Sequence, residues 1–301
     1  MPPAKPKPSE IAAEAKRTYI PYIEQTMPHL PTRSVVHPEL DKLSTGCNGT
    51  TSMRGPRIAV IDGDPVDVAL DWYDYEINSP AQSGTVHYDK GTLRIPVANM
   101  ANEKRAGGDW ESGLLAPEEN LCRRSNLVHC LTTPWNSSMS TPNYPIPTRG
   151  GIYSPNVVVF RSGPDRGYQV WKEFKHLPVI SVAPIRRPKL DEFGKDYSFN
   201  QERELMKEKM RTVLRIAAIW KHRDLCLGAF GAGPSFRNPV RQLASMWKDI
   251  LFTEPEFQGL FLNVVFAIES ASGSSAGSDM TDYEVFKSEF DPSNIFKTAH
   301  R

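Results

Sequence analysis

The chain has 301 residues, of which 39% are hydrophobic, and its formal net charge is +1. A chain of this length can bury a sizeable core, whereas its near-neutral charge provides no bulk attraction to nucleic acid or membranes. No apolar run is long enough for a transmembrane helix and no signal peptide is recognisable. The four cysteines, Cys47, Cys122, Cys130 and Cys226, show no zinc-type pairing and are too few for a disulfide framework. We therefore expect an intracellular protein, cytoplasmic or nuclear, in which the sequons at Asn48 and Asn136 go unused.

The pattern of apolar residues predicts strands that alternate with helices. Strands are expected over β-branched or continuously apolar runs, at residues 57–61, 93–98, 156–161, 178–183, 224–230 and 262–268. Helices are expected where apolar residues recur at helical spacing, at residues 11–19, 64–73, 117–131, 201–222 and 239–251. The first helix is expected to end at Pro21. Residues 28–55 and 132–151 are rich in turn-forming residues and are predicted to be irregular.

Alternating strands and helices predict an α/β protein with three layers, a mixed central sheet flanked by helices. We expect one domain over residues 9–270. The Pro/Lys-rich residues 1–8 are predicted to be a disordered tail, and the Gly/Ser-rich residues 271–301 a C-terminal extension. The loops with the strongest signals each follow the carboxyl end of a predicted strand, where ligands bind in open α/β sheets. They span residues 62–64, 99–109 and 228–236.

The segment at residues 106–125 carries the strongest functional signal. Its glycine pair, Gly107 and Gly108, lets the backbone approach a ligand closely because no β-carbon intervenes. Two adjacent acids, Glu118 and Glu119, follow, and vicinal carboxylates can hydrogen-bond sugar hydroxyls or act as general acid and base. This layout suits cleavage of a nucleotide-sugar bond. The alternative is an ordinary loop leading into a helix whose dipole the two acids complement.

A second glycine-rich segment, residues 228–233, follows the strand expected over residues 224–230. It is not a Walker A motif, because no Gly-Lys-Ser/Thr sequence follows, and it fits the Rossmann fingerprint poorly. It can be either a ligand-binding loop or a tight turn between a strand and a helix. Asp62 and Asp64 follow the strand over residues 57–61, where a carboxylate could accept a hydrogen bond from an adenine amino group. For Asp64, a helix N-cap is the favoured interpretation.

Four motifs, in the same order over roughly residues 10–270, resemble those of the microbial-type poly(ADP-ribose) glycohydrolase family. The family signature is a glycine triplet, a short spacer and Gln-Glu-Glu. Here Gly107-Gly108-Asp109 is followed by seven residues and then by Pro117-Glu118-Glu119. Two positions depart from the signature, because Asp109 replaces the third glycine and Pro117 replaces the glutamine. The other three motifs are Val97–Ala101, Ile152–Val157 and Leu227–Gly233.

The resemblance implies a macrodomain-like fold and a glycosidase that needs no metal or other cofactor. Its substrate would be ADP-ribose polymer or an ADP-ribosylated protein. Glu119 would protonate the leaving ribose oxygen and then activate water, while Glu118 would orient the distal ribose. The transition state of such a reaction has oxocarbenium character, so a nearby carboxylate would also stabilise positive charge.

The resemblance also implies which residues hold the substrate. Gly107 and Gly108 would present backbone N–H groups to the diphosphate or distal ribose, with Asp109 beside them. Asn99 could bond the distal ribose, although an ordinary turn-forming asparagine is an equal alternative. In the second loop, backbone groups would surround the diphosphate, with one phenylalanine against a ribose and another near the adenine. The residues of this loop are Gly228, Ala229, Phe230 (ribose), Gly231, Ala232, Gly233 and Phe236 (adenine).

The two departures leave other functions open. One is an ADP-ribose-binding reader that has lost turnover through Asp109 and Pro117. Another is a hydrolase of a different ADP-ribosyl linkage or of a small NAD-derived metabolite. A carboxylate beside a diphosphate costs about 1 kcal/mol even at the dielectric constant of water. The Asp109 side chain therefore points away, contacts ribose hydroxyls, or reflects a different substrate.

The acid pair favours turnover, because a reader has little use for two vicinal carboxylates.

A basic segment, Arg186, Arg187 and Lys189, follows another predicted strand. There a solvated cluster is favoured over contact with a second ADP-ribose unit.

Overall fold

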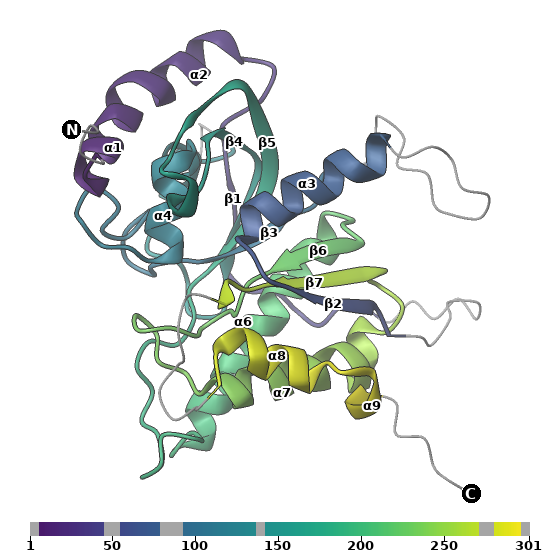
Figure 1. Cartoon of the computed structure of the whole chain (residues 1–301). Coiled ribbons are helices and arrows are strands. Elements are labelled where there is room, and N and C mark those ends of the chain that lie inside the picture. Colours follow the sequence, from purple (N-terminus) through teal and green to yellow (C-terminus); the bar gives the residue numbers. More distant parts are fainter. Residues whose placement is uncertain (1–5, 45–54, 79–92, 137–141, 271–279, 296–301) are drawn as a thin grey trace, which may run out of the picture. The chain divides into compact units, whose positions relative to one another are not determined.

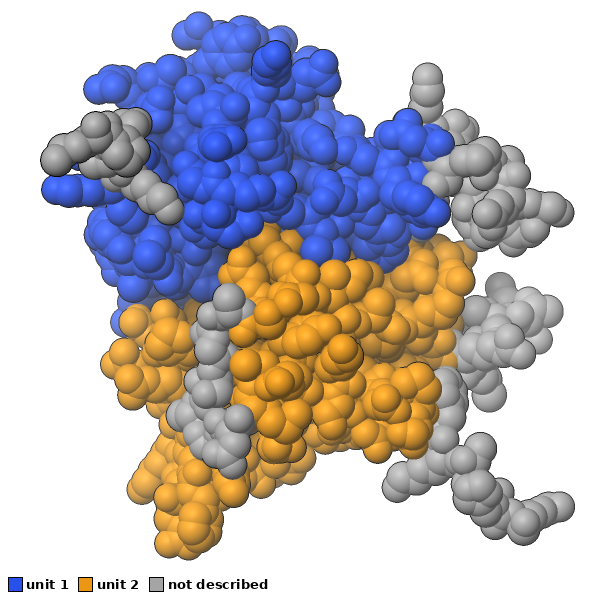
Figure 2. Space-filling model, viewed as in Figure 1, with its two compact units in different colours: residues 1–39, 66–183 blue, residues 40–65, 184–301 orange. Residues whose placement is uncertain are grey.

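The structure is a computed structural model that describes residues 6–44, 55–78, 93–136, 142–270 and 280–295. Cys47, the sequon at Asn48, most of the predicted N-terminal tail and residues 271–279 lie outside the described residues. The chain forms two compact units (Figure 2). Unit 1 comprises Met1–Glu39 and Val66–Ala183, and unit 2 comprises Leu40–Pro65 and Pro184–Arg301. The boundaries of a single domain over residues 9–270 stay a prediction.

The described part of unit 1 contains four strands in the order β1-β4-β5-β3 (Figure 1). Their bounds are β1 Val35–His37, β3 Val97–Met100, β4 Gly151–Arg161 and β5 Val170–Val182. β4 pairs antiparallel with both β1 and β5, whereas β3 and β5 are parallel. The sheet of this unit is therefore mixed, as predicted. Strand β1 lies within the segment that was expected to be irregular. Strand β3 begins only after Pro96, which has no N–H to donate to a neighbouring strand.

The helices of unit 1 surround this sheet. They are α1 Pro8–Glu14, η1 Ala15–Tyr19, α2 Ile20–Thr26, α3 Pro65–Asn78, α4 Pro117–Arg124, α5 Leu127–Thr132 and the short 3-10 turn η2 Pro164–Arg166. Helix α4 packs against α1, β3 and β4, and α5 packs against β4. The loop after β3 and the start of α4 consequently belong to one packed region of this unit.

Two helix boundaries in unit 1 differ from those predicted. The chain does not leave the helical path at Pro21, because a π-helical turn, η1, precedes it and Pro21 occupies the first turn of α2. A proline is tolerated there, since first-turn N–H groups have no partner inside the helix. The helix expected over residues 117–131 breaks at Ser125, whose backbone is extended and bridges Val159. Its hydroxyl caps the broken end by donating to the backbone oxygen of Leu121 at 2.7 Å.

Unit 2 combines parallel strands with two long helices (Figure 1). In order across the sheet its strands are β6 Asp224–Leu227, β7 Asn263–Ala267 and β2 Arg57–Ile61. Both pairings are parallel. The long helices are α6 Asn200–Ile219 and α7 Val240–Thr253. Strand β6 is shorter than predicted because the glycine-rich loop begins at Gly228.

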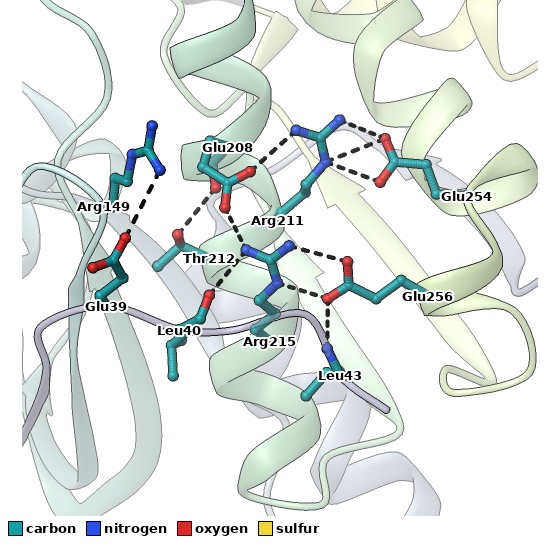
Figure 3. A network of polar contacts seen from close by, with 10 residues as sticks. All are labelled: Glu39, Leu40, Leu43, Arg149, Glu208, Arg211, Thr212, Arg215, Glu254 and Glu256. Atoms are coloured by element: carbon teal, nitrogen blue, oxygen red, sulfur yellow. Dashed lines mark hydrogen bonds and ion pairs between the residues drawn. The ribbon is translucent and has the colours of Figure 1, made fainter. Parts of the chain in front are cut away.

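A buried ion-pair network fastens the first segment of unit 2 to α6 (Figure 3). The guanidinium of Arg215 is 2% exposed and donates to Glu256 at 2.6 and 3.0 Å, and it also pairs with Glu208. Arg215 further donates to the backbone oxygen of Leu40 at 3.3 Å, while the N–H of Leu43 donates to Glu256 at 3.0 Å. The network therefore holds a stretch of backbone that has no secondary structure of its own.

The C-terminal extension contains packed structure. Helix α8, Asp282–Glu289, packs against α7 and β2, with Val285 and Phe286 buried, and α9 Pro292–Ile295 follows it. Thr281 begins α8 with a capping box that the Gly/Ser-rich sequence upstream did not suggest. Among the described residues, no helix is long and apolar enough to cross a membrane. The same residues include no group of three or more His, Cys, Asp or Glu placed to hold a metal ion.

Candidate active site

The two predicted acids lie together at the start of α4, and both are buried. Glu118 is 3% exposed and Glu119 is 7% exposed. Pro117 occupies the first turn, as its lack of an N–H favours. Acids that serve only the helix dipole stay at the surface, because an ionised carboxylate loses its hydration on burial. Burying both carboxylates is costly and needs dedicated hydrogen-bond donors.

The donors to Glu118 come from the end of β3 and the loop after it. The backbone N–H of Asn102 donates to Glu118 Oε2 at 2.7 Å. The side-chain amide of Asn99, which is itself buried, donates to Glu118 Oε1 at 3.4 Å and to the hydroxyl of Ser181 on β5 at 3.1 Å. Burial, together with the adjacent charge of Glu119, nevertheless outweighs these bonds and raises the pKa of Glu118 to about 8. Glu118 is therefore largely protonated at neutral pH.

Glu119 is held by the residue that follows the glycine pair. The backbone N–H of Asp109 donates to Glu119 Oε1 at 3.1 Å. Gly107 and Gly108 have φ angles of 73° and 55°, in the left-handed region that glycine adopts without strain. A β-carbon on Gly108 would lie 2.5 Å from Glu119 Oε1, so the backbone runs directly against the carboxylate. The glycines thus make the close backbone approach that the sequence suggested, and the contact is with the acid itself.

The side chain of Asp109 points away from the acid pair. It forms an ion pair with Arg105, four residues earlier in the same loop, and both side chains are more than half exposed. The charge that replaces the third glycine of the signature is therefore paired at the surface. The structure therefore supports a side chain that points away, rather than one placed to contact ribose hydroxyls.

Tyr144 is a site residue that sequence reasoning missed. Its hydroxyl oxygen is buried and has no hydrogen-bond partner among the described residues. Burial, followed by the charge of Glu118, raises the pKa of this hydroxyl. Its segment is tied to the loop after β3, because the N–H of Ile146 donates to the backbone oxygen of Glu103 at 2.7 Å. The region lacks any motif, so only tertiary structure reveals this residue.

The second glycine-rich loop lies in unit 2, between β6 and α7. Gly231 and Gly233 have φ angles of 92° and 83°. The side-chain amide of Asn238 donates to the backbone oxygens of Gly231 at 2.9 Å and Ile185 at 2.8 Å. Pro239 takes the N-cap position. The loop is therefore shaped by a buried asparagine as well as by its glycines.

The aromatic residues of this loop differ in burial. Phe230 is fully buried, and its ring packs edge-on against Trp247 of α7 with centroids 6.3 Å apart. In this position the ring belongs to the core of unit 2 and does not face a ribose, which corrects the expectation for this residue. The half-buried Phe236 keeps part of its surface exposed. Elsewhere in unit 2, Asp62 accepts two hydrogen bonds from Ser270, at 2.8 and 2.5 Å, so its carboxylate already has partners.

Comparison with known proteins finds a family model that matches part of the chain, and solved structures that share its fold. Residues 45–162 match the family model described as the microbial-type PARG catalytic domain. No curated protein matches the chain. Among solved structures, poly(ADP-ribose) glycohydrolase from Thermomonospora curvata is 19% identical, with 94% of this chain and 99% of that chain covered and a TM-score of 0.63. The same values hold for that protein bound to the inhibitor ADP-HPD.

A second bacterial protein shares the fold. Poly(ADP-ribose) glycohydrolase from Deinococcus radiodurans in complex with ADP-ribose is 22% identical, with 88% of this chain and 97% of that chain covered and a TM-score of 0.63. The predicted α/β macrodomain-like fold, with mixed strand pairing and flanking helices, is thereby confirmed. The resemblance seen in the sequence is confirmed as well, because residues 45–162, which include the buried acid pair, match the catalytic domain of the microbial-type poly(ADP-ribose) glycohydrolase family.

Proposed function

We propose that this protein is a glycosidase that removes ADP-ribose from poly(ADP-ribose) or from an ADP-ribosylated protein by cleaving the O-glycosidic bond of the ribose. The observation that carries the proposal is the buried pair of Glu118 and Glu119. Each accepts a hydrogen bond from a backbone N–H of the loop at residues 102–109, Glu118 at 2.7 Å and Glu119 at 3.1 Å. The family match and the folds of the two bacterial glycohydrolases support it.

The two acids have different roles in this proposal. Once protonated, Glu119 donates its proton to the leaving ribose oxygen as the glycosidic bond breaks, and the resulting carboxylate then takes a proton from the attacking water, which restores the acid. Glu118, which is largely protonated, hydrogen-bonds the hydroxyls of the distal ribose. A neutral carboxylic acid can donate as well as accept, so it can orient a diol. Asn99 helps to fix the position of Glu118 by donating to its carboxyl, and Asn99 also donates to the hydroxyl of Ser181.

In unit 2, the backbone around Gly231 and Gly233 binds the diphosphate and Phe236 lies against the adenine. Positive φ angles turn successive N–H groups toward a common anion, which supports this role for the loop. Neither role requires a metal or another cofactor.

The test is incubation of the purified protein with ADP-ribose polymer and, separately, with a mono-ADP-ribosylated protein, followed by chromatography for free ADP-ribose. Release from the polymer supports the leading proposal. Release only from the mono-modified protein would support another linkage. Binding of ADP-ribose without any release would support a reader.

A further inference from the structure

The loop at residues 102–109 of unit 1 has an inner and an outer side. On the inner side, the N–H groups of Asn102 and Asp109 donate to the two buried glutamates. On the outer side, the side chains of Arg105 and Asp109 form an ion pair, with the guanidinium 64% and the carboxylate 53% exposed. Asp109 therefore joins the two sides, because its backbone touches Glu119 and its carboxylate faces Arg105.

The backbone of Arg105 is fixed close to the acids. Its N–H donates to the side-chain oxygen of Asn102 at 3.1 Å, and its carbonyl accepts from the N–H of Gly108 at 3.0 Å. Within the described part of the chain, the guanidinium is held only by the exposed pair with Asp109. Such pairs contribute at most about 1 kcal/mol. Arg105 can consequently exchange the carboxylate for a better anion without any change in the loop.

The substrate of the proposed reaction offers such an anion. In the proposed reaction Glu119 protonates the leaving group, and Glu119 Oε1 lies 3.1 Å from the N–H of Asp109, whose side chain pairs with Arg105. The departing part of the substrate is therefore expected beside these two residues. When a polymer is cut, the leaving group is a nucleotide unit that carries its own diphosphate. A guanidinium binds phosphate oxygens in a two-pronged geometry and more strongly than it holds an exposed carboxylate. The leaving group from a modified amino acid carries no phosphate.

Building on the proposed function, we propose that Arg105 and Asp109 select the leaving group: Arg105 binds the diphosphate of the departing nucleotide unit, and Asp109 competes for the same guanidinium. Asp109 thereby makes the protein less dependent on a phosphate-bearing leaving group than a chain with glycine at this position. Free ADP-ribose has no leaving group, so its affinity does not depend on Arg105.

The experiment compares Arg105→Ala with Lys104→Ala, which removes the adjacent exposed cation from the same loop. The N–H of Lys104 bonds to the same asparagine oxygen, at 2.9 Å, so the two variants perturb the backbone alike. We expect Arg105→Ala to lower kcat/KM on ADP-ribose polymer about threefold to tenfold, mainly through KM, the scale of one exposed charge-assisted contact. Lys104→Ala should change it less than twofold. Asp109→Asn should raise kcat/KM. The changes in kcat/KM caused by Arg105→Ala and by Asp109→Asn should both shrink at 0.5 M salt, because exposed charges are screened.

Calorimetric titration with free ADP-ribose completes the test. Its dissociation constant should be the same in wild type and all three variants. Equal polymer kinetics in Arg105→Ala and Lys104→Ala would overturn the leaving-group role. So would an equal loss of ADP-ribose affinity and polymer activity in Arg105→Ala, which would place the contact on the bound unit instead. A wild-type protein that binds ADP-ribose but leaves the polymer intact would overturn the proposed function first and this inference with it.

Discussion

Gly108 and Glu119 fit against each other without room for a single methyl group. A β-carbon on Gly108 would lie 2.5 Å from Glu119 Oε1 and 3.3 Å from Glu118 Oε2. The backbone of Gly108 also has a φ of 55°, which other residues rarely adopt. The glycine is therefore required for two independent reasons, conformation and space.

Replacing Gly108 by alanine should push the glutamate carboxylates out of position and lower hydrolysis of ADP-ribose polymer by at least about tenfold, since a small misplacement of a catalytic group costs heavily. Gly113→Ala is the matched control. Gly113 lies in the same segment between β3 and α4, and its φ is not in the left-handed region. A β-carbon at this position would meet nothing within 4 Å. Polymer kinetics of the two variants provide the measurement. Similar activities would show that Gly108 does not position the acids.

Glu119→Gln should keep the affinity for ADP-ribose nearly unchanged and lower hydrolysis at least ~100-fold, because the amide cannot transfer the proton. Glu118→Ala should weaken both binding and rate, because Glu118 is assigned to orientation of the ribose. Glu103→Gln, an exposed acid in the preceding loop, serves as control. Rate assays and calorimetry separate the two effects. A Glu119→Gln variant with activity within a few-fold of wild type would rule out its role as the acid.

The buried carboxyl of Glu118 should make folding stability depend on pH. Its pKa is about 8 in the folded protein and 4.5 ordinarily, so between these values the folded state binds more protons than the unfolded state. The contribution of Glu118 to stability is thus fully present below about pH 4.5 and is lost as pH rises through about 8. Glu118→Gln removes this dependence. Urea unfolding at pH 5, 6.5 and 8 should show the variant gaining on wild type as pH increases, and a constant difference would contradict the raised pKa.

Free ADP-ribose should stabilise the folded protein by mass action, by about 2.7 kcal/mol at a hundredfold excess over its dissociation constant. ADP should stabilise it less at equal concentration, because ADP lacks the distal ribose assigned to Glu118 and Asn99. Thermal unfolding with each ligand tests this. If millimolar ADP-ribose leaves the melting temperature unchanged, neither the glycosidase nor the reader interpretation holds.

The network around Arg215 should be structurally essential (Figure 3). Arg215→Ala leaves Glu256, only 9% exposed, without the arginine that it pairs with, while Glu208 keeps its 3.2 Å pair with Arg211. Removing one partner of a buried pair costs about 3–5 kcal/mol. The control is Arg149→Ala, which breaks a 3.8 Å pair with Glu39 whose side chains are 64% and 69% exposed and should cost at most about 1 kcal/mol. Chemical denaturation of both variants would measure the difference, and equal costs would show that burial does not strengthen the network.

The acid pair and both glycine loops were predictable because their signals are local. Vicinal acids after a glycine pair can be recognised in a single sequence, because the residues lie close together along the chain. The position of the acids at the start of a helix is likewise predictable from the neighbouring residues. Phe230 was misplaced for the opposite reason. Its burial depends on Trp247, a contact partner on another helix that local sequence does not reveal.

Two other errors follow the same logic. Pro21 obeys a local rule for ending helices, but the π-helical turn before it supplies a conformation that this rule does not include. Tyr144 belongs to no motif and reaches the site through the tertiary bond between Ile146 and Glu103. The pairing of Asp109 with Arg105 was not predictable, because side-chain direction in a loop depends on turns that residue types only partly determine.

The burial of Cys122 allows opening of the loop at residues 102–109 to be followed by thiol labelling. Its thiol is fully buried, and a β-carbon on Gly107 would lie 3.1 Å from its sulfur. Burial, with the nearby glutamates, holds the thiol pKa well above its usual range, so the group is neutral and unreactive while the loop is closed. Alkylation of this cysteine requires the loop to separate from α4. In a chain whose other cysteines are replaced by serine, the labelling rate of Cys122 would therefore measure how often the loop opens, and a bound ligand that keeps the loop closed would slow that rate.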